Sequence, residues 1–487
     1  MGFETTTALT CTTAFCLVIC WIWFRQRFPE NLKELPLPPG PEPAFIVGNL
    51  KDIPTGGREW DGYAALACKF RDDVLYLRVL RTSILSINSF DAANELLNRR
   101  GAVWSDRPRL PMIRTCDGWD WNLVLQSYHE GFFTHRRIVQ QHFQPGVVAR
   151  EYRPVMLSEV TVLLQNLLDT PQHLSDHLKR MAAAIIMMVT YGHRVVSDDD
   201  PFVQLAEEVR RHSEEALGAA LVDTLPILKY LPSWIAPFKR TALFKRGLSD
   251  QMREAPFIAV KKQLASGKAV RSMVGSLLED ESRPTDGSDE ELIKNCGGVT
   301  ATALTNFFLA MILYPDVQRR AHQELDAKIG RKRLPRFEDR DDLPYLGAIL
   351  KETLRWKSVT PLGIPHCTTK ADEYNGSFIP ARTTVLANIS AMLHEKEVYH
   401  DPDEFNPDRF LSQNPEPDPA RAAFGFGRRI CPGRFFADDS VWIAMGQKEG
   451  KYNNVQWSSG SVSVPSAFFC DIQPRFDGAE SLVGHGD

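Results

Sequence analysis

The chain begins with an uncharged, mostly apolar run from Thr5 to Phe24. A helix needs about twenty apolar residues to cross the hydrocarbon layer of a bilayer. Arg25 and Arg27 follow this run, so the positive-inside rule places the rest of the chain in the cytosol. A cleaved signal peptide is the alternative, but no basic residue precedes the run. We therefore expect a single-pass membrane anchor over residues 1–28.

A proline-rich segment over residues 29–43 follows the expected anchor. It contains Leu35-Pro36-Leu37-Pro38-Pro39-Gly40-Pro41, and prolines at this density favour a stiff, extended chain. The segment therefore predicts a spacer between the membrane and a folded body over residues 44–487. No linker or internal repeat divides that body.

Two short strand-like runs, Val74–Val79 and Ser83–Asn88, are expected to pair, with the break at Arg81 and Thr82. A further β-rich part is expected around Asp372–Leu386. Elsewhere, apolar residues recur at three- and four-residue steps, which is typical of helices that bury one face. The helices expected on this pattern are Pro154–Leu168, His177–Tyr191, Val203–Leu221, Val317–Ile329, Tyr345–Trp356 and Arg434–Met445.

The stretch Leu225–Arg246 combines aromatic residues with lysines and arginines and is interrupted by prolines. Such a composition suits partial immersion in a membrane interface. An ordinary packed connection between two helices would look similar, and the residues do not distinguish the two.

Composition excludes several classes of function. The net charge of −4 and the absence of a basic tract with interleaved aromatics give no reason to expect nucleic acid. The nine cysteines include no Cys-x-x-Cys pair and no zinc-type spacing, so neither a disulfide scaffold nor a zinc site is expected.

One cysteine has unusual surroundings. Cys431 lies between Gly427 and Gly433, at the start of an expected helix, and three arginines are close in sequence: Arg428, Arg429 and Arg434. Glycines permit a tight backbone path around a sulfur, and a helix N-terminus with nearby cations favours the thiolate. Thiolate is the form that ligates haem iron. Inert burial is the alternative for a lone cysteine, but these surroundings favour a ligand.

The pattern Phe424-x-x-Gly427-x-Arg429-x-Cys431-x-Gly433 resembles the haem-binding signature of the cytochrome P-450 family. Two further segments resemble family features in the expected order: Glu352-Thr353-Leu354-Arg355 and Phe405-Asn406-Pro407-Asp408-Arg409-Phe410. The nearest similarity is to fungal secondary-metabolism hydroxylases of the microsomal type.

This resemblance implies a mainly α-helical fold with a small β-rich lobe. It implies haem b with an axial thiolate from Cys431, and monooxygenation of a small lipophilic substrate. The expected partners are an NADPH-dependent flavoprotein reductase and membrane lipid. The expected location is the endoplasmic reticulum membrane, with the catalytic domain facing the cytosol.

The resemblance also suggests roles for particular side chains. Glu352 and Arg355 lie three residues apart, share one helix face and can pair, and Arg409 can join them in a structural network. Candidate partners for the haem propionates are Arg136 and His366, together with Arg429. For His366, a purely structural role with its hydrogen bonds made inside the protein is nearly as good an interpretation as binding a propionate.

The chain departs from the family at the central helix, expected over 290–312. Family members carry an acid-threonine pair that delivers protons, but this chain has no acid between Glu291 and Asp316. Thr300 and Thr302 are the candidate proton-relay residues. The helix after the cysteine is also expected to be shorter than in the family, because the apolar pattern ends after Met445. These departures leave open a reductase-independent isomerase or dehydratase, and an inactive haem-binding member.

Overall fold

The computed structural model describes residues 31, 33–197, 199–213, 236, 238–279, 296–445, 476 and 478–482. The expected anchor at 1–28 and the shortened segment after Met445 lie outside these ranges. Within them, no helix has both the length and the apolar character needed to span a bilayer.

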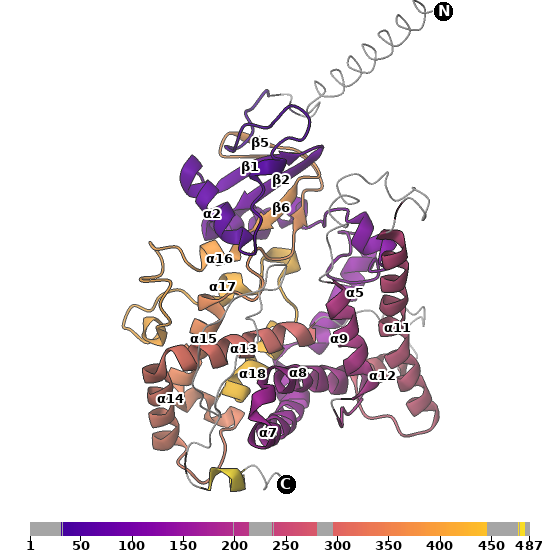
Figure 1. Cartoon of the computed structure of the whole chain (residues 1–487), viewed down its shortest axis with the longest axis vertical. Helices are drawn as coiled ribbons and strands as arrows, with labels where there is room; N and C mark the ends of the chain where they lie inside the picture. Colours follow the sequence, from indigo (N-terminus) through magenta and orange to yellow (C-terminus); the bar gives the residue numbers. More distant parts are fainter. Residues whose placement is uncertain are drawn as a thin grey trace, which may run out of the picture.

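Helices make up most of the described chain (Figure 1). The α-helices are α2 (Glu59–Phe70), α3 (Phe90–Ala93), α4 (Gly101–Trp104), α5 (Glu130–His142), α6 (Pro145–Val147), α7 (Arg153–Asp169), α8 (Leu174–Tyr191), α9 (Pro201–Ser213), α11 (Phe238–Ala265), α12 (Met273–Glu279), α13 (Cys296–Leu313), α14 (Pro315–Lys328), α15 (Pro344–Trp356), α16 (Ile389–Met392), α17 (Ala420–Ala423) and α18 (Arg434–Met445). Short 3-10 or π-helical turns are η1 (Leu50–Asp52), η2 (Asn94–Arg99), η3 (Met112–Cys116), η4 (Val148–Tyr152), η5 (Pro171–His173), η8 (Phe337–Asp342), η9 (Pro407–Phe410), η10 (Gly427–Arg429) and η11 (Ala479–Leu482).

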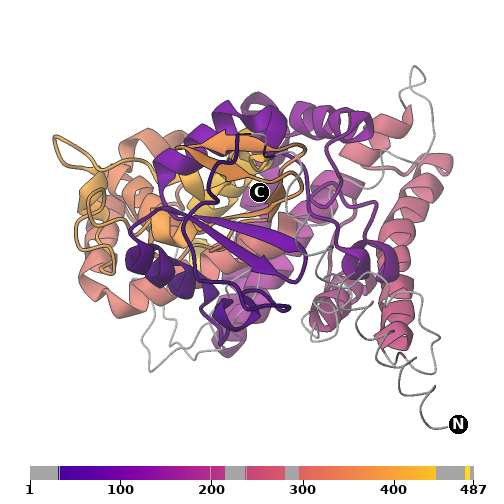
Figure 2. The same cartoon turned by 90° about the horizontal axis from the view of Figure 1, so that it is seen from above.

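The strands form a small lobe at one end of the molecule. They are β1 (Val74–Val79), β2 (Thr82–Ile87), β3 (His366–Cys367), β4 (Asp372–Tyr374), β5 (Ser377–Ile379) and β6 (Thr384–Ala387). Four of them make a sheet in the order β1-β2-β6-β3, and β4 pairs with β5. Strands β2 and β6 run parallel, whereas β1 with β2 and β3 with β6 are antiparallel. Figure 2 looks down on this lobe, with the helices beneath it.

The expected secondary structure is largely confirmed. The strand pair is present, but its turn lies at Leu80 and Arg81, one residue earlier than expected, and Leu80 takes a left-handed φ of 51°. Helices α7, α8, α14, α15 and α18 lie within three residues of the expected bounds. The central helix α13 ends at Leu313, one residue later than expected. Of the stretch Leu225–Arg246, only residue 236 and residues 238–246 are described, and the latter form the start of α11.

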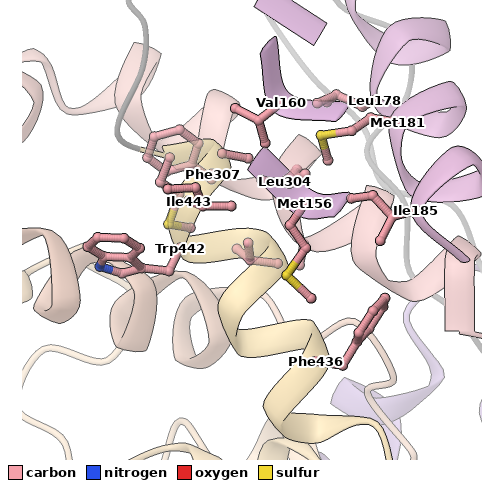
Figure 3. Packing of buried hydrophobic residues seen from close by; sticks show 14 of the residues in the cluster. Met156, Val160, Leu178, Met181, Ile185, Leu304, Phe307, Phe436, Trp442 and Ile443 are labelled. Carbon is pink, nitrogen blue, oxygen red and sulfur yellow. The ribbon is translucent and has the colours of Figure 1, made fainter. Parts of the chain in front are cut away.

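The largest core lies where α13 crosses α7, α8 and α18. Leu304 and Phe307 of α13 pack there beside Met156 of α7, Met181 of α8 and Ile443 of α18 (Figure 3). The described side chains from Ala303 to Met311 are all buried, on every side of the helix. A helix that is buried on every side lies in a protein core or spans a membrane, and α13 packs against other helices of this protein. The sequence of α13 therefore fixes it as the central element.

The described part of the proline-rich segment lies on the sheet lobe. Its carbonyl groups at Pro36 and Pro39 accept hydrogen bonds from the N–H groups of Phe378 and Tyr76, at 2.7 and 2.8 Å. A Cβ added at Gly40 would lie 2.0 Å from the Tyr76 carbonyl oxygen. The segment is thus attached to the catalytic body along this stretch.

We expect His394 to make the stability of the fold depend on acid pH. Its Nδ1 donates to the Ser390 carbonyl at 2.8 Å, and burial, with Arg355 nearby, lowers its pKa to about 4. In the unfolded chain His394 becomes protonated near pH 6.5, whereas in the folded protein its ring stays neutral down to about pH 4. The stability contributed by the neutral, buried ring is therefore fully present above pH 6.5. It is lost as the pH falls towards about 4, at up to about 1.4 kcal/mol per pH unit.

The measurement is denaturant unfolding of wild type and His394→Gln across this range. Glutamine keeps a donor and does not titrate, so the variant should lose less stability on acidification. His173→Gln, which changes an exposed histidine, is the control. Equal pH slopes in wild type and His394→Gln would contradict the assignment.

Candidate active site

Cys431 lies in the connection from η10 to α18, held by its own neighbours. Its N–H donates to the Phe424 carbonyl at 2.8 Å, and Arg136 of α5 donates to the adjacent Ile430 carbonyl. Burial raises the pKa of the Cys431 thiol, while a hydrogen bond from the Gly433 N–H and the charge of Arg136 lower it. Without further positive charge the thiol is favoured, and a bound metal ion would convert it to the thiolate.

The glycine pattern before the cysteine has a steric cause. Gly427 has a left-handed φ of 55°, and an added Cβ would lie 2.1 Å from the Leu97 carbonyl oxygen of η2. Its N–H donates to the Asn98 side chain in the same turn. No other residue type fits this close approach. Gly427 therefore sets the cysteine loop against η2.

Three buried arginines surround this loop. Arg429 donates to the carbonyls of Ser105 and Gln126, each at 2.8 Å, and Arg107 donates to the carbonyl of Pro365 at 2.7 Å. Burial lowers the pKa of all three, and lowers that of Arg429 to about 10. For Arg107 the lowering is increased by the neighbouring charges of Arg429 and Arg136. The cluster therefore has an excess of positive charge.

Two N–H groups in this cluster are buried without a protein partner, Nε of Arg136 and Nη1 of Arg429. Buried cationic donors normally meet an acceptor. An anionic ligand with carboxylate groups would satisfy them, which is what a haem propionate supplies.

A charge count supports the same ligand. The three guanidinium groups, with Arg434 also close to Arg136 and Cys431, face one carboxylate, that of Asp106, and one potential thiolate, that of Cys431. A ferric porphyrin core carries one positive charge and its two propionates carry two negative charges. Adding that group brings one net negative charge, which reduces the excess positive charge of the cluster, so the residues present fit haem b.

His366 lies in the same cluster. Its Nδ1 is 2.8 Å from the Trp104 carbonyl, which can only accept, so Nδ1 carries the proton. Burial and the nearby charge of Arg107 lower its pKa to about 3, which keeps the ring neutral. A propionate could bind Nε2 only if it raised this pKa enough to add a second proton.

The expected ion-pair network is present and has a fourth member. Arg355 donates through Nε and Nη2 to Glu352, each at 2.8 Å, and both side chains are fully buried. Arg409 reaches Glu352 at 3.2 Å and Glu416 at 2.6 Å. Two acids therefore balance two bases, which a buried network requires.

The network also secures the chain that leads to the cysteine. Arg355 donates to the carbonyls of Leu393, Pro402 and Glu404 at 2.7–3.1 Å. Glu352 accepts from the Asn406 N–H at 2.8 Å. Helix α15 is thereby joined to the segment over 393–416.

Of the two candidate relay residues, Thr302 is buried on α13. Thr300 lies on the same helix. The described part of α13 begins at Cys296 and carries no carboxylate, as its sequence indicates.

A model of the cytochrome P-450 family matches residues 38–447. The chain belongs to this family. It is 37% identical to a cytochrome P-450 monooxygenase of Armillaria gallica, over 98% of this chain and all of that protein. Two others are the monooxygenase claR of Ampulloclitocybe clavipes, 36% identical over 92% and 88% of the two chains, and ple1 of Rhodocybe pseudopiperita, 34% identical over 93% and 92%.

Membership establishes a mainly helical P-450 fold with a small sheet lobe, and monooxygenase as the class of enzyme. Proteins of this family bind haem b through a cysteine thiolate. The alignment with the Armillaria protein spans 514 positions, more than this chain's 487 residues, so that relative has residues without a counterpart here.

Sequence reasoning missed two residues of this P-450 site, Arg107 and Glu416. Arg107 belongs to a chain segment with no regular pattern, so only its burial beside Arg136 and Arg429 reveals it. Glu416 lies in a proline-rich loop where a lone acid is unremarkable. Its contact with Arg409 depends on how that loop folds back.

We expect Cys431→Ala to abolish the red-shifted Soret band of the reduced, CO-bound protein, because that band requires an axial thiolate. Cys367→Ala is the matched control, since Cys367 is a buried free cysteine in β3. The measurement is the CO difference spectrum of both variants expressed in membranes. A thiolate-type band that persists in Cys431→Ala would contradict this assignment.

We expect Glu352→Gln to destabilise the fold by about 3–5 kcal/mol, because it leaves buried arginines unbalanced. Lys351→Gln, on the same helix, removes an exposed pair with Asp418 and should cost at most about 1 kcal/mol. Both are measured by denaturant unfolding. Similar losses in the two variants would show that the network contributes no more than a surface ion pair.

Proposed function

We propose that this P-450 is a membrane-bound monooxygenase that oxidises a small lipophilic substrate. Its electrons come from an NADPH-dependent flavoprotein reductase. The observation that carries the proposal is the pairing of the Cys431 loop with buried, unpaired donors on Arg136 and Arg429. Haem bound there through a thiolate supplies the chemistry that cleaves O–O bonds.

The chain's own residues have separate roles in this proposal. Cys431 ligates the iron, and Arg136 and Arg429, which have buried donors without a partner, hold the propionates. Arg107 adds positive charge beside them. Helix α13 excludes water, because its described side chains from Ala303 to Met311 are buried and mostly apolar. The hydroxyls of Thr302 and Thr300 hold the proton that other family members pass through an acid.

The proposed location is the endoplasmic reticulum membrane. It is supported by an exposed apolar surface over residues 45–50, next to the proline-rich segment, which we call the apolar tip. Phe45 and Ile46 are 71% and 57% exposed, and Val47 and Leu50 are also exposed. Consecutive exposed apolar residues are uncommon on soluble surfaces and suit a lipid interface. The tip lies about twenty residues after the uncharged run that predicts an anchor.

The reductase assignment is supported by an exposed surface close to the cysteine loop. Phe133 and Arg137 of α5 are exposed there, as are Arg428 and Phe435 beside Cys431. Arginine and aromatic side chains are enriched at protein interfaces. An acidic surface on a flavoprotein would complement them and bring its electrons to the thiolate side.

A reductase-independent isomerase or dehydratase is the second candidate, favoured by the missing acid in α13. The test incubates membranes with a reductase and NADPH, against a set of terpenoid and aromatic compounds. A parallel incubation replaces both with an organic hydroperoxide. Oxygenated product that requires NADPH supports the monooxygenase. A rearranged or dehydrated form of the hydroperoxide itself, with no product from NADPH, supports the isomerase or dehydratase, and no product in either incubation supports an inactive member.

We expect Thr302→Val to lower the yield of product per NADPH consumed about tenfold, because removing a proton donor typically costs 10²–10⁴-fold where no water replaces it and less where one does. Hydrogen peroxide should rise to account for the electrons. Thr300→Val is measured alongside. Thr353→Val, which changes a buried threonine in α15, is the control. Unchanged coupling in both α13 variants would remove the threonines from the proton relay.

A further inference from the structure

The segment over 118–128 crosses the protein between α11 and the cysteine loop without forming a helix or strand. Parts of it are nevertheless buried, with Trp121 only 5% and Gln126 only 6% exposed. The Trp121 indole N–H donates to the Ser249 hydroxyl of α11 at 3.1 Å, and that hydroxyl donates to the Gly118 carbonyl at 3.0 Å. One end of the segment is therefore fixed to α11.

The side chain of Gln126 joins this segment to helix α5. Its Nε2 donates to the Trp121 carbonyl at 3.0 Å, and its Oε1 lies 3.2 Å from Nδ1 of His135. The Trp121 carbonyl can only accept, so the amide nitrogen faces it and Oε1 must accept from His135. Both ends of this buried amide are thus satisfied, and the imidazole is held with its proton on Nδ1.

The backbone of the same residue holds Arg429. The Gln126 carbonyl accepts from Nη2 of Arg429 at 2.8 Å, and the Ser105 carbonyl accepts from Nε at 2.8 Å. The guanidinium also stacks on the Phe132 ring of α5, with 3.7 Å to its centroid. Two carbonyls and one ring therefore fix the plane of the guanidinium, and its buried Nη1 is left without a partner.

We propose that Gln126 is a positioning residue for the haem. By tying α5 to the carbonyl that orients Arg429, it aims the free Nη1 of Arg429 at a haem carboxylate. The same tie fixes the distance between Arg429 and the neighbouring cation Arg136, which follows His135 on α5. The inference rests on the proposed role of Arg429 in binding a propionate. It adds a residue that binds no part of the haem itself.

Sequence patterns give no indication of this role. Gln126 lies in an irregular segment, and a glutamine there would be expected at the surface. Gln126 contacts Arg429 through its backbone carbonyl, and every residue type has that group, so the identity of the residue does not indicate the contact. A buried glutamine with a purely structural role would affect the stability of the fold but would not change the electrostatics at the iron.

The test compares Gln126→Met with wild type as purified ferric holoenzymes. The first measurement is the rate of haem transfer to excess apomyoglobin, which should rise about fivefold, the factor expected for one lost hydrogen bond. The second is the ferric–ferrous midpoint potential, which should become more negative. A nearby positive charge destabilises ferric iron more than ferrous iron. When Arg429 is held less firmly this destabilisation is weaker, so the potential falls. The red-shifted CO band should remain, because Cys431 is untouched.

Two further variants complete the design. Gln318→Met changes another buried glutamine, on α14, and should alter neither quantity. Gln126→Leu is made in parallel, so that a folding failure of one variant leaves the other. Unchanged haem release and potential in the Gln126 variants would overturn the inference. So would equal changes in Gln318→Met.

Arg429→Gln separates this inference from the proposal beneath it. If Arg429→Gln changes haem retention or potential and Gln126→Met does not, only the positioning role of Gln126 fails. If Arg429→Gln changes neither, the propionate role of Arg429 fails and the inference fails with it.

Discussion

The buried network of Glu352, Arg355, Arg409 and Glu416 is the constraint on which the rest of the site depends. It joins α15 to the chain over 393–416, which leads directly into the cysteine loop. Charges buried this deeply are tolerated only when each is matched, and the fourth member provides that match. The cysteine loop therefore starts from a fixed point in the helical body rather than from a free loop.

The cysteine lies between two parts of the fold, the sheet lobe and the helical core. On one side, Gly427 places its loop against η2 of the sheet lobe at a distance that no side chain allows. On the other side, α18 packs its apolar face on α13 and α7 (Figure 3). The sulfur thus lies between the lobe and the core, where Arg136, Arg107 and Arg429 converge. An anionic ligand bound by these arginines would stabilise the folded state, because it would offset their excess positive charge.

The departure from the family lies on α13, away from these contacts. Helix α13 retains its packing surface, since Leu304 and Phe307 are buried against α18 and its neighbours. What it lacks is a carboxylate before Thr302. The cysteine loop with its arginines and the helix that carries the two proposed relay threonines are thus different parts of the chain. The first can be intact while the second differs from other members of the family.

The sequence by itself determined the family, the cysteine motif, several of the helices and the pairing of Glu352 with Arg355, because each depends on residues close together in the chain. Hydrophobic periodicity and the positions of glycines can be seen within a short window of sequence. Arg107, Glu416 and the orientation of Arg429 by the Gln126 carbonyl were decided only by tertiary structure. Their partners lie 7 to 303 residues away in sequence, and two of the contacts use backbone carbonyls, which every residue type possesses.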